Sequence, residues 1–187
     1  LSYMLFYSDG VSSVAMQNGV LAVGSDVANN GATLISFISD SAYRHRDGST
    51  SYPILANISD RNVDIAGGAN TSEGSIVDDT VYNVALTVLP NAPIDAATGL
   101  PVVTVAVGTE GGTSVIKDDG TVVNSSSNAK ASDVHFADTV LYVATGTAYY
   151  RSVWYHTNYL VGSFTYDHDW LNSSLVQAGD LNYLGAS

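Results

Sequence analysis

The sequence predicts an all-β fold made of β-propeller-type antiparallel blades, with about three repeats in the 187 residues. A pattern of three short apolar strands occurs three times along the chain. Alternating and short β-branched runs dominate, and Asp-Gly, Asn-Gly and Gly-Gly pairs that are typical of tight turns separate them. Helical periodicity is almost absent. A repeated small all-β unit indicates an array, and the propeller is the commonest array of this kind.

The three copies share an order: an apolar strand, a strand that ends in Gly-Ser or a Gly/Thr pair, and a strand that leaves a Gly or Tyr turn. The predicted strands are 13–16, 20–25 and 31–37 in the first copy, 83–86, 103–109 and 112–116 in the second, and 133–136, 140–146 and 149–155 in the third.

Turn signals place the hairpins between these strands. Asn18-Gly19 lies between two apolar stretches, where both turn positions need a positive φ. Asp119-Gly120 predicts a second hairpin, and Asp9-Gly10 and Asp47-Gly48 two further turns. The glycine-rich run 108–112 lies between two strands, so it predicts a β-turn rather than a phosphate-binding loop, which needs a helix N-terminus. Residues 57–80 and 89–100 read as long loops.

These elements predict a division of the chain into units. Residues 1–10 form the end of a preceding blade, with 3–7 as its last strand. Residues 11–75, 76–130 and 131–170 form the three repeats, and 171–187 form a short helix, over 171–178, or the start of a further repeat. Because rings close at roughly four to eight blades, three units predict either a fragment of a larger propeller or a ring that several copies complete. The start at Leu1 rather than Met favours an internal segment of a longer protein.

Composition excludes several classes of function. Six basic residues face eighteen acidic ones, a net charge of −12, which disfavours a nucleic-acid partner because such binding needs a basic footprint. No apolar run reaches the ~18 residues of a membrane helix, so no membrane partner is expected. There is no cysteine, hence no disulfide, thiol catalysis or thiolate metal site.

One block of the middle repeat is familiar as a whole. It runs Asn-Val-Ala-Leu-Thr-Val-Leu-Pro-Asn-Ala-Pro-Ile-Asp at 83–95, Ala-Thr-Gly-Leu-Pro at 97–101, Thr-Val-Ala-Val at 104–107 and Gly-Thr-Ser-Val-Ile-Lys-Asp-Asp-Gly-Thr-Val-Val at 112–123. Residues 34–40 and 57–62 look like the preceding unit. The block resembles a propeller-like repeat region of large proteins from marine bacteriophages and marine viral metagenomes, which is often joined to a laminin-G-type, concanavalin-like lectin domain.

The resemblance covers roughly residues 11–145, whereas the aromatic-rich stretch after Tyr149 has no counterpart and no lectin domain is visible. It implies a virion-associated structural or adhesion protein, such as a tail or fibre component, and it brings no catalytic residues.

Three short motifs carry groups that could bind a metal. Asp167, His168 and Asp169 alternate along a predicted strand or loop, so they would not converge on one ion. The Asp-Asp pairs at 118–119 and 78–79 have the oxygen ligands that calcium prefers, but turn chemistry explains both more simply. The sequence therefore predicts no metal and no cofactor.

Aromatic residues concentrate between 142 and 170. Amphipathic rings dominate sugar-stacking and protein-docking faces, and the alternative is that these rings pack between blades or between subunits. The candidate contact surface consists of Tyr149, Tyr150, Trp154, Tyr155, Tyr166 and Trp170, with Tyr159 as a further ring in the same stretch.

The predicted function is a non-catalytic scaffold of a phage tail or fibre, located in the virion. Its loops would contact other virion proteins, further copies of the chain or a host-surface glycan. No Gly-x-Ser-x-Gly or His-Glu-x-x-His motif is present, so no enzyme is predicted. Two alternatives remain open: a polysaccharide hydrolase or lyase of a tail protein, and a secreted bacterial adhesin.

Overall fold

The computed structural model describes residues 10–38, 41–47, 52–55, 74–96, 98–125, 129–146, 151–156, 159–160 and 168–172. For 52–55, 151–152, 154–156 and 168–172 only the backbone is described. This part of the chain contains strands and turns and no helix. The expectation for 3–7 lies outside the described residues.

The strands form three antiparallel sheets, each an up-and-down meander in sequence order. Sheet 1 contains β1 (Ser13–Gln17), β2 (Val20–Gly24), β3 (Ala32–Ser36), β4 (Ser41–His45) and β5 (Tyr52–Leu55). Sheet 2 contains β6 (Val81–Thr87), β7 (Thr104–Thr109), β8 (Gly112–Ile116) and β9 (Val122–Asn124). Sheet 3 contains β10 (Ala131–Ala137), β11 (Val140–Gly146), β12 (Arg151–His156) and β13 (His168–Asn172).

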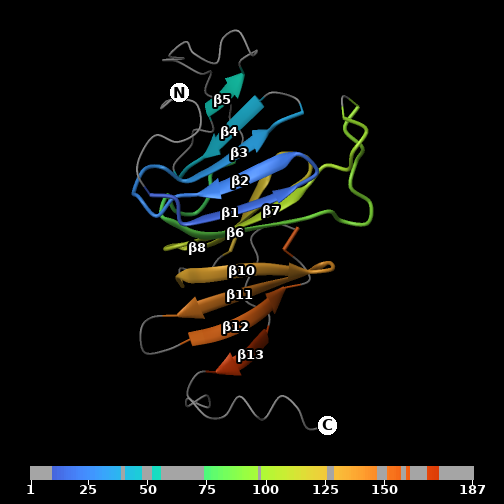
Figure 1. Cartoon of the computed structure of the whole chain (residues 1–187). Helices are drawn as coiled ribbons and strands as arrows, with labels where there is room; N and C mark the ends of the chain where they lie inside the picture. The colour runs from blue at the N-terminus through green and yellow to red at the C-terminus, as the bar shows by residue number, and fades with distance from the viewer. Residues whose placement is uncertain are drawn as a thin grey trace.

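The first strand of each sheet lies at the centre of the molecule. In Figure 1, β1, β6 and β10 run side by side, while β5 and β13 lie at opposite ends. The contacts between sheets run through these first strands, with β6 between β1 and β10. Sheet 2 is therefore covered on both faces, and every residue of β7 and β8 is buried.

Two apolar cores separate the three sheets. The core between sheets 1 and 2 is built on Ala22, Val81, Val84 and Val107, and the connecting residue Ile76 closes it. The core between sheets 2 and 3 contains Ala106, Val115, Val134, Phe136, Leu141, Val143 and Tyr159. On β7, Val107 belongs to the first core and its neighbour Ala106 to the second, because successive side chains of a strand point to opposite faces of the sheet.

The predicted hairpins at Asn18-Gly19 and Asp119-Gly120 are confirmed, whereas Asp9 and Gly48 of the two other predicted turns lie outside the described residues. Asn18 and Gly19 have φ of 49° and 77°, as the two-residue turn between β1 and β2 requires. At the second hairpin only Gly120 has a positive φ (81°), because Lys117 and Thr121 close a three-residue loop, in which a left-handed residue follows a type I turn. Glu110 and Gly111 form the predicted turn between β7 and β8.

The strand predictions are largely confirmed and need three corrections. Strands β4 and β5 extend sheet 1 where no strand was expected, because short mixed segments such as 41–45 lack a clear alternation. Residues 168–172 form β13, so Leu171 and Asn172 end a strand and do not start a helix. Residues 173–187, which hold the rest of that expected helix, lie outside the described residues.

Sheet 1 spans residues 13–55, sheet 2 spans 81–124 and sheet 3 spans 131–172. The long loop predicted at 57–80 is described only from Gly74, and 74–80 contains no strand. The loop predicted at 89–100 contains one isolated bridge, between Ile94 and Pro101.

Candidate functional site: the sheet faces and their polar rim

The candidate aromatic surface is described only in part. Trp154 and Tyr155 lie on β12, where they pair with Asp169 and His168 of β13. Trp170 also lies on β13. Tyr149, Tyr150 and Tyr166 lie outside the described residues.

Tyr159 belongs to a core rather than to a surface. Its ring lies 5.7 Å from the ring of Phe136, and its hydroxyl donates a hydrogen bond to the carbonyl of Thr139 at 2.9 Å. Burial raises the pKa of the Tyr159 hydroxyl. For this ring the alternative of packing between sheets is confirmed.

The Asp-rich motifs serve turns. The carboxylate of Asp119 accepts hydrogen bonds from the backbone N–H and the hydroxyl of Thr121, at 2.9 and 2.6 Å. These bonds, the hydroxyl first, and Lys117 lower the pKa of Asp119 to about 2. Asp78 accepts a bond from the N–H of Thr80 at 2.7 Å. The turn interpretation is therefore confirmed at both motifs.

Three apolar positions on or just before the first strand of each sheet lie on one face, and we call them the presenting stripe. In sheet 2 the stripe covers sheet 1, and in sheet 3 it covers sheet 2. The stripes are Val81, Val84 and Leu86 in sheet 2, and Ala131, Val134 and Phe136 in sheet 3. In sheet 1, Val14 and Met16 lie at the register positions of Val84 and Leu86, and Val11 precedes the strand by two residues.

The opposite face of each sheet, which we call the receiving face, has small residues in sheets 1 and 2. An added Cβ on Gly24 would lie 2.6 Å from Val81 Cγ1, and one on Gly108 would lie 2.8 Å from the carbonyl oxygen of Ala131. Gly108 pairs with Asn83, the second residue of a bulge that opens β6. Gly24 pairs with Ser13, and its carbonyl accepts a hydrogen bond from the Ser12 N–H at 3.0 Å. The receiving faces are Ser13, Ala15, Ala22 and Gly24 in sheet 1, and Asn83, Ala85, Ala106 and Gly108 in sheet 2.

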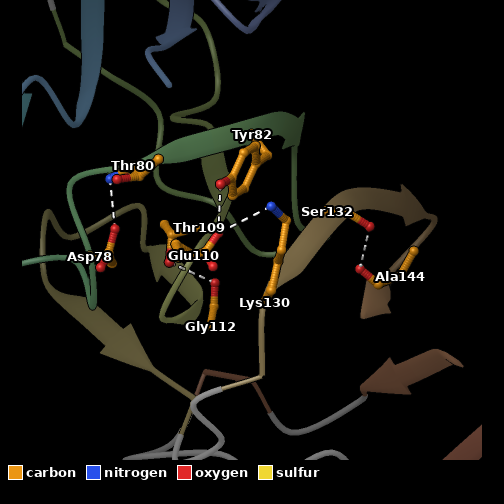
Figure 2. A network of polar contacts seen from close by, with 9 residues as sticks. All are labelled: Asp78, Thr80, Tyr82, Thr109, Glu110, Gly112, Lys130, Ser132 and Ala144. Carbon is orange, nitrogen blue, oxygen red and sulfur yellow. Dashed lines mark hydrogen bonds and ion pairs between the residues drawn. The ribbon is translucent and has the colours of Figure 1, made fainter. Parts of the chain in front are cut away.

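A polar cluster lies on the rim where sheets 2 and 3 meet (Figure 2). The hydroxyl of Tyr82 donates a hydrogen bond of 2.5 Å to Glu110 Oε2, and Lys130 Nζ donates one of 3.1 Å to the same oxygen. The ammonium also lies 3.6 Å from the centroid of the Tyr82 ring. Tyr82 and then Lys130 lower the pKa of Glu110, and Tyr82 and then Glu110 raise the pKa of Lys130.

The rim between sheets 1 and 2 uses different chemistry. Asp79 accepts a hydrogen bond of 2.6 Å from the Asp47 N–H and lies 3.8 Å from the Arg46 guanidinium. His45 is buried beside it, and its imidazole bonds to the backbone of Gly74. Burial lowers the pKa of His45 to about 4, so this histidine is neutral at pH 7.

Sequence reasoning missed both rims, because their partners lie 20 to 32 residues apart and share no motif. The acidic pair at 78–79 is visible in the sequence, but the cationic partners are not adjacent to their carboxylates. Arg46 follows a strand of sheet 1, and Lys130 precedes the first strand of sheet 3. Within the described ranges no group of three or more His, Asp or Glu side chains is arranged to hold a metal ion. Nor does any described helix have the length and apolarity needed to cross a membrane.

Comparison with known proteins assigns no family. No protein-family model matches the sequence, and no curated protein matches it. A solved structure that resembles the chain is the crystal structure of the computationally designed Ika8 protein, with a TM-score of 0.31 and 11% identity. The match covers 82% of this chain and 48% of the designed chain, so this chain spans about half the length of that protein. At this level of similarity the match carries no structural argument.

Proposed function

We propose that the chain is a non-catalytic, propeller-type scaffold segment of a virion-associated tail or fibre protein. The observation that carries this proposal is the repetition of one inter-sheet contact. Sheets 1 and 2 and sheets 2 and 3 are joined through their first strands by residues at equivalent positions. A stack that repeats one joint is suited to building a larger assembly rather than to enclosing one reaction site.

The loop between β6 and β7 is the proposed contact element. The segment between β6 and β7 projects as an arm on the right of Figure 1. The N–H of Asp95 donates to the carbonyl of Leu100 at 2.9 Å, and the Asn18 amide donates to the carbonyl of Pro101 at 2.9 Å, so the arm is bonded both to itself and to sheet 1. Ile94 and Leu100 are exposed on it.

Exposed apolar side chains on a bonded arm are typical of a docking loop, because the backbone is ordered before the partner arrives. The proposed partners are other virion proteins, further copies of the chain or a host-surface glycan. The polysaccharide-degrading alternative differs in predicting release of reducing ends from a polysaccharide, which the assay below also measures.

The test is binding and turnover measured on one panel of bacterial cells and purified surface polysaccharides. We expect retention of the chain on at least one cell type, with loss of binding in Ile94→Ser and no release of reducing ends. Val27→Ser is the matched control, because Val27 is also exposed and apolar but lies on the turn between β2 and β3. Release of reducing ends that is lost in His135→Ala would replace the scaffold proposal with the enzyme alternative.

A further inference from the structure

The presenting stripe of sheet 1 is exposed, whereas its two equivalents are buried except for the partly buried Leu86. Val84 is 4% exposed and Val134 is 3% exposed, but Val14 is 59% exposed. The flanking positions repeat the contrast: Val81 is 0% exposed and Val11 is 51% exposed. Met16 is 61% exposed, whereas the equivalent Phe136 is 9% exposed.

The uncovered stripe is narrow. On the same face of sheet 1, Val23 pairs with Val14, and Ile35 lies in register with Met16 through β2, and both Val23 and Ile35 are buried. Within the strands of sheet 1 the exposed large apolar side chains are Val14 and Met16 of β1, while Phe37 and Ile38 are exposed just after β3. The first strand is also the strand through which sheets 2 and 3 make their contacts. The exposed surface matches the part of a sheet that forms the joint in the rest of the molecule.

The two internal joints show what kind of surface covers such a stripe. In both, the partner sheet has Ala or a small polar residue on its first strand and Gly on its second strand. The glycine is needed because the added Cβ would lie within 2.8 Å of the incoming strand at either joint. Hydroxyls of the partner sheet also bond the incoming backbone: Ser12 Oγ donates to the Val81 carbonyl at 2.6 Å, and Ser13 Oγ accepts from the Val84 N–H at 3.2 Å.

The outward face of sheet 3 lacks the small residues and the glycine of these two receiving faces. At the positions of Ser13 and Ala15 it has Asp133 and His135, both exposed. At the positions of Ala22 and Gly24 it has Tyr142 and Ala144. Two bulky side chains and a carboxylate would have to be buried against Val14 and Met16, and burial of an unpaired carboxylate is costly. Among the described sheets of a second copy, the two suitable faces are already covered, so the described part of the chain offers no free receiving face for the stripe.

We propose that Val11, Val14 and Met16 form a docking stripe for a further antiparallel sheet of the type of sheets 1 and 2. That partner sheet has small residues on its first strand and a glycine on its second strand, at the position of Gly24 and Gly108. The stripe is expected to pack on a receiving face of small residues and not on the outward face of sheet 3. This inference rests on the proposed scaffold function, and it specifies the surface that the adjoining part of the assembly must present.

The test converts sheet 3 into a receiving face and asks whether the chain then binds itself. The variant combines Asp133→Ser, His135→Ala, Tyr142→Ala and Ala144→Gly, which gives sheet 3 the receiving residues of sheet 1. Native mass spectrometry and light scattering measure the mass of the native chain and of the variant at equal concentrations. We expect a monomeric native chain and head-to-tail oligomers of the variant, and we expect Val14→Asp in the variant background to return it to a monomer.

Val27→Asp in the same background is the matched control, since it adds the same charge to an exposed valine outside the stripe. If the fourfold variant does not fold, as judged by its β-sheet circular dichroism, a variant that keeps Asp133→Ser, His135→Ala and Ala144→Gly but has Tyr142→Ser in place of Tyr142→Ala takes its place. A folded variant that stays monomeric would overturn the inference, and so would a native chain that oligomerises in a manner abolished by Val14→Asp. Neither result touches the scaffold proposal, which the binding and turnover assay tests separately.

Discussion

The two joints between the sheets share their apolar centres and differ at their rims. At both centres a branched or aromatic stripe packs on alanine and glycine of the neighbouring sheet. At the first rim a buried, neutral His45 lies beside the Asp79 contacts. At the second rim Glu110 and Lys130 form an exposed ion pair under Tyr82. The apolar centre is thus repeated at both joints, whereas the polar contacts at the rims are not.

The largest expected effect is the difference in unfolding free energy between truncating a buried presenting stripe and truncating the exposed one. Phe136→Ala removes a buried ring from the core between sheets 2 and 3 and should lower the free energy of unfolding by about 3–5 kcal/mol. Met16→Ala at the equivalent position should change it by less than about 0.5 kcal/mol, because Met16 is exposed. Urea denaturation of the two variants measures the difference. Equal losses would show that Met16 is covered in the isolated chain.

Acid should weaken the first rim. The pKa of His45 is 6.5 in the unfolded chain and about 4 in the folded one, so the unfolded state binds the proton more readily. Stability is fully present above pH 6.5 and is lost as the pH falls from 6.5 towards 4, by of the order of 3 kcal/mol. The measurement is the urea midpoint against pH for the native chain and His45→Gln, which should flatten the curve in that range. His135→Gln is the control, because His135 is exposed, and it should leave the curve unchanged.

The two glycines should differ in how a clash can be relieved. Gly24→Ala and Gly108→Ala should each lower the free energy of unfolding by about 1–3 kcal/mol through overpacking. Adding Val81→Ala to Gly24→Ala should recover part of the loss, because the obstacle there is a Val81 methyl group. At Gly108 the obstacle is the backbone carbonyl of Ala131, which no side-chain truncation removes. A thermodynamic cycle over the single and double variants measures the coupling, and zero coupling between positions 24 and 81 would contradict the close contact.

The smallest expected effect concerns the second rim. Lys130→Gln removes the ion pair with Glu110 and the contact with the Tyr82 ring, at a cost of about 0.2–1 kcal/mol that salt should reduce. Lys117→Gln is the matched control, since its 3.2 Å pair with Asp119 lies within one turn and joins no sheets. Urea denaturation at low and high salt compares the two variants. A loss that salt leaves unchanged would indicate that packing on Tyr82, rather than charge, holds this rim.

Local sequence was enough to predict most of the strands and the hairpins between them. Asn18-Gly19 encodes its own turn, because few residues other than asparagine and glycine adopt positive φ at both positions at low cost. Strands β4 and β5 were not predicted as strands, since they are stabilised by pairing with β3 and β4 rather than by their own alternation. The sequence left Tyr159 open between a contact surface and packing between blades, and its burial beside Phe136 shows that it packs in a core.

The sequence by itself determined the all-β class, the three repeated units and the positions of their turns, because these depend on residues within a few positions of one another. The tertiary structure decided which face of each strand meets which sheet. Val14, Val84 and Val134 look alike in the sequence, yet two are buried and one is exposed. Exposure depends on whether another sheet lies over the strand, and no local pattern carries that information.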